Sequence, residues 1–331
     1  MIMNCATIII PTLNRAIHLK RCLDSLAKNG WAKYSPILIS VDYPPSDKYE
    51  QGYGEVISML KTYDFSYFKT AKVFYQERNL GPSQNFEFLV EHSNGKVILT
   101  EDDNEFSPNF LEYINKGLDL FKDDDNVIAI CGCKDTHWCH DNDENVVKIK
   151  FYTPYGLGIW AEKWKKLNLE IPEHLLSPQT WTLNNFWRLL IHNQTLFSMY
   201  VLGILCSNTG FFWGDNGRLM VYDSTISIFM HLTDKVCIAP IISKSRTWGN
   251  DGSGVNMKAS PDNGKKIIDT NDTFSYHYDG KLDFDSNNFK KGNQYLGGSI
   301  LNKSTLHALG VLAVFYILGK NRERVIRFLS H

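Results

Sequence analysis

The sequence predicts an α/β protein whose mostly parallel sheet is flanked by helices. Three observations support this class. Short apolar, β-branched runs alternate with amphipathic helical segments through residues 1–125, and the connections between them are short. Apolar residues also make up 43% of the 331-residue chain, enough for a sizeable core. Because parallel strands need a crossover between them, usually a helix, the alternation favours a parallel sheet covered on both faces.

The first strand and helix set the pattern for this half. Residues 6–10 are apolar and are expected to form a buried strand. A helix with apolar residues at helical spacing follows and ends at Gly30; these residues are Ile17, Leu19, Cys22, Leu23 and Leu26. Later elements are expected as strands over residues 36–42, 72–76, 97–100, 127–131 and 235–238, and as helices over 54–62, 83–91, 224–232 and parts of 175–205. Right-handed crossovers then bring the ends of the first four strands to one edge of the sheet.

Charge and cysteine content exclude some classes of function. The formal net charge is −1 and no basic stripe is present, so nucleic acid is not an expected partner. The seven cysteines are odd in number and irregularly spaced, which suits a reducing compartment. We expect a cytoplasmic protein without a signal peptide, because the apolar run at residues 8–10 is short and no basic segment precedes it. No apolar stretch reaches the length of about 20 residues that a spanning helix needs.

Three adjacent acids, Glu101, Asp102 and Asp103, directly follow the expected strand over residues 97–100. Adjacent carboxylates repel each other, and a hard cation with oxygen ligands would relieve the repulsion. Ligands of open α/β sheets also bind beyond the carboxyl ends of the strands. This favours a metal site for a phosphate-bearing substrate. The alternative is an acidic loop in which Asp103 or Asn104 caps a helical turn, with a helix starting near residue 108.

The strand ends bring further polar residues to the same rim. If the first four strands are parallel, residues distant in sequence gather there, and their convergence strengthens the functional interpretation of the acidic triplet. These residues are Asn14, Arg15, Asp42, Arg78, Asn79, Asp102 and Asp103.

Four motifs occur in a fixed order: residues 9–15, a strand ending in Asp42, residues 77–81, and the acidic triplet. In this order and spacing they resemble the nucleotide-binding half of glycosyltransferases with the GT-A fold, and most closely family-2-type bacterial enzymes. The triplet followed by residues 107–110 and Tyr113 is similar to N-acetylglucosaminyltransferase I. The resemblance covers residues 5 to about 165, and more weakly 213–257.

The resemblance implies a nucleotide-sugar site with Mn²⁺ or Mg²⁺. The triplet takes the place of the family's DXD motif, with Asp103 as the metal ligand and with Glu101 and Asp102 beside the nucleotide-sugar. The remaining residues implied to contact the nucleotide are Pro11, Thr12, Asn14, Arg15, Asp42, Arg78, Asn79 and Gly81. For Arg78 the alternative is a surface salt bridge, and for Gly81 it is an ordinary turn.

Glycines and aromatic residues of the second half are a further candidate region. Gly156 and Gly158 would let the backbone approach a donor sugar closely. Tyr155, Trp160 and Trp164 could stack on sugar faces, although we favour a packing role for Trp164. Other large aromatic residues are expected in the core, namely Trp181, Trp187 and Phe197.

An inverting transferase needs a carboxylate that takes the proton of the acceptor hydroxyl. Asp223 is the first candidate, because relatives often have an acid just ahead of a helix at this place, and Asp215 is the second. The alternative for Asp223 is a cap on the helix over residues 224–232.

The glycine-rich loop at residues 249–254 resembles the Gly-Asp-Gly-Ser/Thr-Gly loop of bacterial relatives. It contains Asp251 as a donor-binding candidate and would order over the donor as a lid. In relatives this loop often ends in His, whereas here Asn256 stands there, which weakens a transferred metal role. A plain flexible loop is the alternative.

Cysteine and histidine also cluster at residues 131–140, which raises a zinc site as an alternative to buried thiols and loop histidines. The spacing is irregular, and Cys131 and Cys133 are expected to face into the sheet. The resemblance implies no zinc here.

The chain is expected to divide into a GT-A catalytic domain over 1–257, with a nucleotide-sugar-binding half (1–125) and an acceptor-side half (126–257), and a loop-rich extension over 258–331. The extension ends in an apolar helix with a basic tail. This helix would lie on the inner face of a membrane or, alternatively, dock on the body or on a second subunit.

The expected function is metal-dependent, inverting transfer of a sugar from a nucleotide-sugar, with a UDP-sugar favoured. The acceptor would be a saccharide or a lipid-linked saccharide, as in bacterial surface polysaccharide synthesis. A sugar nucleotidyltransferase is one alternative. That class is typically marked by a Gly-rich loop directly after the first strand, and residues 11–14 of this chain form no such loop. A non-catalytic sugar-binding domain is the other.

Overall fold

The fold is organised around β1 (Thr7–Thr12), in a computed structural model that describes residues 4–93, 95–133, 145–205, 222–254, 259–278 and 303–329. Side chains of β1 alternate between two cores. Ile8 and Ile10 pack with helices on one face of the sheet, and Ile9 packs with helices on the other. A strand apolar on both sides belongs inside a parallel sheet covered on both faces, as predicted.

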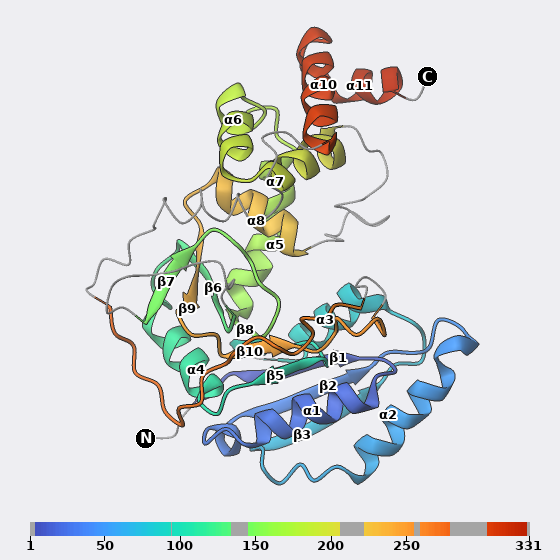
Figure 1. Cartoon of the computed structure of the whole chain (residues 1–331), viewed down its shortest axis with the longest axis vertical. Helices are drawn as coiled ribbons and strands as arrows, with labels where there is room; N and C mark the ends of the chain where they lie inside the picture. The colour runs from blue at the N-terminus through green and yellow to red at the C-terminus, as the bar shows by residue number, and fades with distance from the viewer. Residues whose placement is uncertain are drawn as a thin grey trace.

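The first four strands of the main sheet are parallel. They are β1, β2 (Pro36–Val41), β3 (Thr70–Tyr75) and β4 (Lys96–Leu99), in the spatial order β3-β2-β1-β4. Helices α1 (Ala16–Ala27) and α2 (Glu50–Thr62) cover one face, and α3 (Gly81–Glu91) covers the other (Figure 1). The predicted alternation is confirmed, and the ends of the four strands share one rim.

The second half extends this sheet. β8 (Leu157–Trp160) lies antiparallel between β4 and β6 (Val127–Cys131), and β9 (Val236–Pro240) and β7 (Val146–Ile149) complete eight strands. One continuous sheet therefore crosses the expected division at residue 125. Short helical turns are η1 (Ala32–Tyr34), η2 (Asp47–Tyr49) and the π-helical η3 (Tyr200–Leu205).

A two-stranded ribbon follows the acidic triplet. β5 (Asn104–Phe106) pairs antiparallel with β10 (Ser245–Thr247), which brings the glycine-rich loop beside the triplet. The alternative in which Asp103 or Asn104 caps a helical turn is wrong, because Asn104 begins a strand. The next helix, α4 (Phe110–Leu120), begins directly after Asn109 in the sequence.

The remaining helices gather at one end of the molecule (Figure 1). They are α5 (Ala161–Leu175), α6 (Leu183–His192), α7 (Gln194–Met199), α8 (Tyr222–Leu232), α10 (Lys303–Ile317) and α11 (Arg322–Leu329). Trp181 and Phe197 are buried, as expected. Two expectations fail: Trp187 is 62% exposed and Ile17 is 76% exposed. Each lies on the outward face of its helix, whose core contacts are made by other residues, such as Phe186 and Leu189 in α6.

The C-terminal extension packs on the body. Residues 259–278 form no helix or strand, and the rings of Phe274 and Tyr276 pack against Tyr113 of α4. Helix α10 packs on α7 and η3, with Val311 and Phe315 in the core. Docking on the body is thus observed for one face of this helix. Within the described ranges, no helix is long and apolar enough to cross a lipid bilayer.

Candidate functional site

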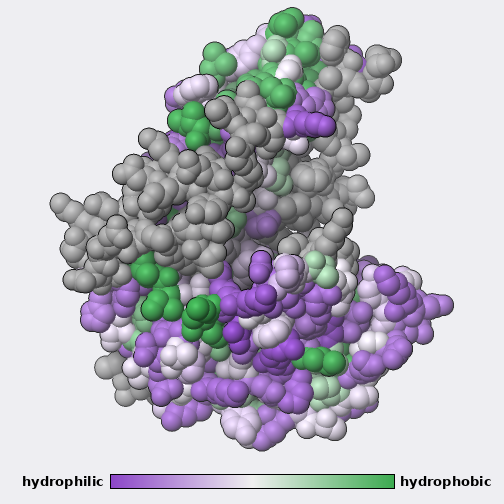
Figure 2. Space-filling model, viewed as in Figure 1, coloured by the Kyte–Doolittle hydropathy of each residue, from purple (hydrophilic) through white to green (hydrophobic). Residues whose placement is uncertain are grey.

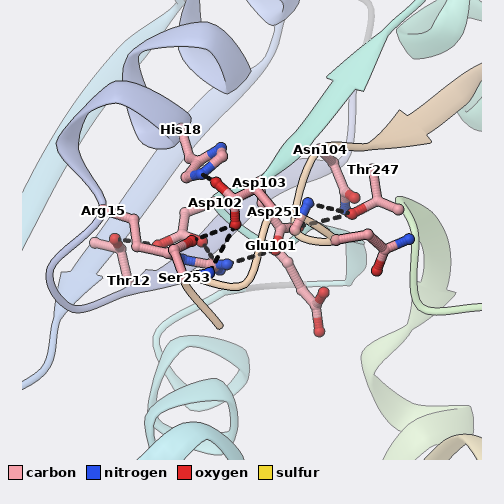
Figure 3. Close-up of polar contacts among 12 residues, drawn as sticks. Thr12, Arg15, His18, Glu101, Asp102, Asp103, Asn104, Thr247, Asp251 and Ser253 are labelled. Carbon is pink, nitrogen blue, oxygen red and sulfur yellow. Dashed lines mark hydrogen bonds and ion pairs between the residues drawn. The ribbon is translucent and has the colours of Figure 1, made fainter. Parts of the chain in front are cut away.

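The candidate site lies where β1 and β4 end side by side. Backbone pairing of the two strands places Thr12 close to the triplet, and the Thr12 hydroxyl donates to Asp102 Oδ2 at 2.7 Å (Figure 3). Asp102 and Asp103 are both buried. Buried carboxylates need hydrogen bonds and a counter-charge, and the chain supplies both.

The counter-charge is Arg15, the residue that precedes α1. One guanidinium nitrogen donates to Asp103 Oδ2 at 2.7 Å, and the other donates to Asp102 Oδ1. Burial lowers the pKa of Arg15, but the charges of Asp102 and Asp103 outweigh this and raise it, so the guanidinium stays charged. For Asp102, an acid, burial has the opposite effect and raises the pKa, whereas the positive charge of Arg15 partly offsets this rise.

The glycine-rich loop covers Asp103 from the other side. The Thr247 hydroxyl donates to Asp103 Oδ1 at 3.4 Å, and the Trp248 N–H donates to the Asp103 carbonyl at 2.8 Å. A Cβ atom on Gly249 would overlap the Asp103 carboxylate. Close approach of the Asp103 carboxylate therefore favours glycine at this position, a reason that the sequence pattern, which predicted a lid, did not give.

The same loop is fastened to α1. His18 Nε2 lies 2.8 Å from Asp251 Oδ2, and Ser253 donates its N–H and hydroxyl to Asp251 Oδ1. Partial burial raises the pKa of Asp251, but the hydrogen bonds from Ser253 and His18 lower it to about 2. The His18–Asp251 contact thus holds the loop against α1. Asn256, where relatives often have His, lies outside the described residues.

Sequence reasoning missed a cluster that supports this loop. The Arg21 guanidinium carbon lies over the Trp248 ring, 4.3 Å from the ring centroid. The indole Nε1 of Trp248 donates to Glu105 Oε2 at 2.6 Å. Arg246 Nε donates to the same oxygen at 2.8 Å. A spacing of three residues between Arg15, His18 and Arg21 places them on one face of α1, a signal that could have revealed the cluster.

Glu101 differs from its two neighbours. Its side chain is exposed and points away from Asp102 and Asp103 (Figure 3). Nearby protein atoms still displace much of the water around its carboxyl group. This crowding, together with the charges of Asp103 and Asp102, raises the pKa of Glu101 to about 8. Two acids of the triplet thus face Arg15, whereas the third faces outward and interacts with them through charge.

Asp223 lies in the first turn of α8, close enough to Glu101 for its charge to raise the pKa of Glu101 further. Burial and the charges of Glu101 and Asp223 contribute to the raised pKa of Tyr155, which is about 12. The cap hypothesis for Asp223 is wrong, because α8 already includes this residue. Among the described residues, the N–H that donates to its Oδ1 is that of the next residue, Ser224, at 2.7 Å. Asp215 lies outside the described residues.

Asp42 is held by backbone groups. Its two carboxylate oxygens accept from the N–H groups of Tyr43, Leu80 and Gly81 at 2.8 to 2.9 Å. Gly81 has φ of 72°, which favours glycine, and Asn79 donates to the carbonyl of Tyr43 at 2.6 Å. Asp42 thus fixes the turn that begins α3.

The other predicted residues are spread more widely. Arg78 is exposed, and no salt bridge to it is found within the described ranges. Pro11 pairs with Ser40 inside the sheet, and Asn14 lies against Gly52 of α2. Gly156 (φ 79°) leaves room for the rings of Phe106 in β5 and Phe110 in α4. Gly158 leaves room for Ile114 and Leu118 of α4. The two glycines have a packing reason that the sequence did not show.

The predicted core aromatic residues and thiols can also be placed. Trp164 is buried and Trp160 donates its Nε1 to the Leu118 carbonyl at 3.1 Å, so both pack. Cys131 and Cys133 are buried, as expected. Residues 134–144, which complete the hypothetical zinc cluster, lie outside the described residues.

The arrangement does not form a ready-made metal cage. Within the ranges that the structure describes, no three His, Cys, Asp or Glu side chains converge on one point. Each of the four carboxylate oxygens of Asp102 and Asp103 already accepts a hydrogen bond, and the Arg15 guanidinium lies where a cation bound to both would lie.

The comparisons with known proteins identify the family. The model of glycosyl transferase family 2 matches residues 7–175, about half of the chain. The chain therefore belongs to glycosyl transferase family 2. No curated protein matches it.

Three of the solved structures that match the chain are remotely similar to it. A mannosyltransferase from Pyrobaculum calidifontis, in complex with GDP-Man and Mn²⁺, is 15% identical (TM-score 0.37; 49% of this chain and 46% of that chain). S. aureus TarS 1–349 is 15% identical, with a TM-score of 0.37 over 60% of this chain and 66% of that chain. GalNAc-T7 with UDP, GalNAc and Mn²⁺ is 15% identical, with a TM-score of 0.35 over 50% of this chain and 36% of that chain. The chain thus covers less than two thirds of each. The expected similarity to N-acetylglucosaminyltransferase I gains no support from these matches.

Proposed function

We propose that the protein is a glycosyltransferase that moves a sugar from a nucleotide-sugar to a saccharide or lipid-linked saccharide, with inversion at the anomeric carbon. A UDP-sugar is the first donor to test, and bacterial surface polysaccharide synthesis is the proposed setting. Family membership supports the reaction class. The donor, the acceptor and the stereochemistry are proposed from the residues of this chain.

One observation carries the proposal. A network of hydrogen-bonded side chains lies at the rim where two parallel strands end, and it is made by Thr12, Arg15, Asp102 and Asp103. Ligands of open α/β sheets bind at this position. The loop over residues 249–254, fastened to α1 by His18 and Asp251, closes one side of the rim. We assign the rim to the donor and the loop to a lid over it.

The residues then have distinct proposed roles. Arg15, a permanent cation, would bind diphosphate oxygens. Asp42 would act through the turn at residues 79–81, where Asn79 and Gly81 border the nucleotide, and Arg78 is exposed and available for a phosphate. A divalent cation, if bound, would neutralise charge on the leaving diphosphate; Asp103 is the proposed ligand.

For the base we propose Asp223. It lies near the rim acids but outside the Arg15 group, and its charge reaches both Glu101 and Tyr155. Its carboxylate would accept the proton of the acceptor hydroxyl while the hydroxyl oxygen bonds to the anomeric carbon and the nucleoside diphosphate leaves. Asp215 remains the second candidate.

The direct test is a panel of nucleotide-sugars with Mn²⁺, in which release of nucleoside diphosphate is measured with and without saccharide acceptors. A transferase releases nucleoside diphosphate, faster with its acceptor than without. Release of pyrophosphate from a nucleoside triphosphate and a sugar phosphate would instead indicate a nucleotidyltransferase. No release in any arm, with intact sugar binding, would indicate a non-catalytic domain.

We also propose that the helical end of the molecule contacts an anionic membrane surface. Leu183, Trp187 and Ile191 lie four residues apart on α6 and are exposed, as are Leu306 and Ile317 of α10. Figure 2 shows hydrophobic residues gathered at this end of the molecule. Three arginines of α11 and Lys320 follow in sequence, Arg322, Arg324 and Arg327. Apolar and basic residues together are typical of interfacial helices.

Point variants test this contact better than deletion of residues 305–331, because Val311 and Phe315 of α10 belong to the core. Trp187→Ser should weaken binding to vesicles that contain anionic lipid, in a flotation assay, and Ile267→Ser, an exposed apolar residue of the segment over residues 259–278, is the matched control. If the unaltered protein ignores anionic vesicles, the proposed contact is wrong.

A further inference from the structure

We propose that Arg15 is an internal cation of the acidic motif, and that a divalent metal binds Asp102 and Asp103 only by displacing it. The proposal deepens the proposed function, on which it rests, by assigning Arg15 a positioning role at the donor site. It follows from the disagreement noted above: the family's motif implies a metal, whereas the arrangement in this chain leaves no place for one.

The contacts define the competition. The guanidinium donates to one oxygen of each carboxylate, and the two outer oxygens accept from the hydroxyls of Thr12 and Thr247. The two aspartate side chains are almost fully buried, so water cannot screen their mutual repulsion well. A single planar cation that bridges both carboxylates removes that repulsion. A divalent cation would do the same, and both cannot occupy the space between the carboxylates.

Arg15 is also placed so that it can leave. It precedes α1 and its side chain makes no capping hydrogen bond, so rotation of the side chain breaks no helical contact. Its side chain is 19% exposed, in contrast to the two buried acids. A side chain that is partly exposed and makes no capping hydrogen bond can turn toward a diphosphate, whereas Asp102 and Asp103 are fixed by the strand end.

The test measures binding of Mn²⁺ alone, without nucleotide, by electron paramagnetic resonance on the full chain. Removing the competing charge in Arg15→Gln should tighten Mn²⁺ binding by about tenfold or more, since like charges that compete for the same buried carboxylates repel each other strongly. Arg15→Lys should lie between the two, because an ammonium keeps the charge but cannot bridge both carboxylates in the same way. Lys20→Gln, on the exposed face of α1 and paired with Asp24, removes one charge elsewhere and should change nothing.

A second measurement guards against loss of folding. Arg15→Gln leaves two buried carboxylates without a counter-charge, so its melting temperature should fall without metal and rise more with Mn²⁺ than that of the wild type. Addition of Asp103→Asn to Arg15→Gln should abolish the gain in Mn²⁺ affinity.

Equal or weaker Mn²⁺ binding in Arg15→Gln overturns the proposal, as does a lack of Mn²⁺ binding in every form. Either outcome leaves the proposed function standing if the wild type still releases nucleoside diphosphate from a nucleotide-sugar. If the wild type fails in that assay but Arg15→Gln gains Mn²⁺ affinity, the proposed function fails and the displacement of Arg15 does not.

Discussion

Two aspartate sites on the same rim are held in different ways. Asp42, after β2, accepts hydrogen bonds from three backbone N–H groups. The pair of Asp102 and Asp103, after β4, is held by side chains that come from β1, from the start of α1 and from β10. Both sites are buried carboxylates at strand ends, and the sequence pattern places both on the same rim.

The difference lies in what each site can exchange. Asp42 accepts mainly from backbone donors, which the fold fixes, with the Asn79 side-chain amide as a weaker donor at 3.3 Å, so its main partners move only if the turn that begins α3 moves. Side-chain donors can rotate within microseconds or faster, so the pair of acids can pass from Arg15 to a ligand. The comparison therefore predicts loss of stability from one site and loss of activity from the other.

The largest effect is expected for Asp103→Asn. Transfer should fall to background, because this variant removes the proposed metal ligand and half of the Arg15 contact. The free energy of unfolding, from urea titration, should change by less than about 1 kcal/mol, since Arg15 keeps Asp102 and one repulsive neighbour is gone. Full activity in this variant, or full wild-type activity in excess EDTA, would contradict the metal role.

Asp223→Asn should follow, with kcat lowered by about 10² to 10⁴, the usual cost of losing a general base. Affinity for nucleoside diphosphate, measured by calorimetry, should stay near that of the wild type, because the base acts mainly in the transition state. Asp215→Asn should do less. If Asp223→Asn keeps its kcat, Asp215 becomes the first candidate; if both variants keep theirs, the base lies elsewhere.

Asp42→Ala should reverse the pattern of Asp103. Three backbone N–H groups lose their acceptor, so the free energy of unfolding should fall by about 2 to 4 kcal/mol. The donor KM should rise, because the turn at residues 79–81 loses its anchor. Asp47→Ala, an exposed acid a few residues further on, should cost less than about 0.5 kcal/mol. Unchanged stability of Asp42→Ala would show that the two aspartate sites do not differ as described.

The smallest effect is expected for His18→Ala, which loosens the loop at residues 249–254. Contacts between partly exposed polar side chains contribute about 0.2 to 1 kcal/mol, so the donor KM should rise by about fivefold at most. The steady-state KM of Lys20→Ala, on the same helix, gives the reference value. A large fall in kcat with unchanged KM would mean that His18 takes part in the chemistry and does more than hold the loop.

Much of the fold could be predicted from the sequence because it depends on local pattern. Apolar runs bounded by turns gave the parallel strands, and strand parallelism placed Asp42, Asp102 and Asp103 on one rim. Helical periodicity alone did not show which face of a helix would be covered. Ile17 stands at helical spacing with core residues of α1, yet it is exposed. Trp187, a large aromatic residue of an apolar stretch and expected in the core, is exposed too.

The site could be predicted only in part, because its contacts join distant segments. Residue types indicated that Arg15 and Asp103 belong to one site, but not that they bond to each other across 88 positions of sequence. Pairing of β5 with β10 decides the place of Trp248 beside Glu105, and neither strand is long enough to be seen in the sequence. The packing reason for Gly158 likewise lies in α4, which no pattern around residue 158 reveals.

The central claim is that the rim formed by Thr12, Arg15, Asp102 and Asp103 is the donor site. A crystal structure of the protein with a nucleoside diphosphate and Mn²⁺ tests it most directly. The account predicts density for the nucleotide between the rim and the loop at residues 249–254, Mn²⁺ on Asp103, and the Arg15 guanidinium moved from Asp103 to the diphosphate. A nucleotide bound elsewhere, or one bound at the rim with Arg15 still bridging the two aspartates beside a metal, would contradict it.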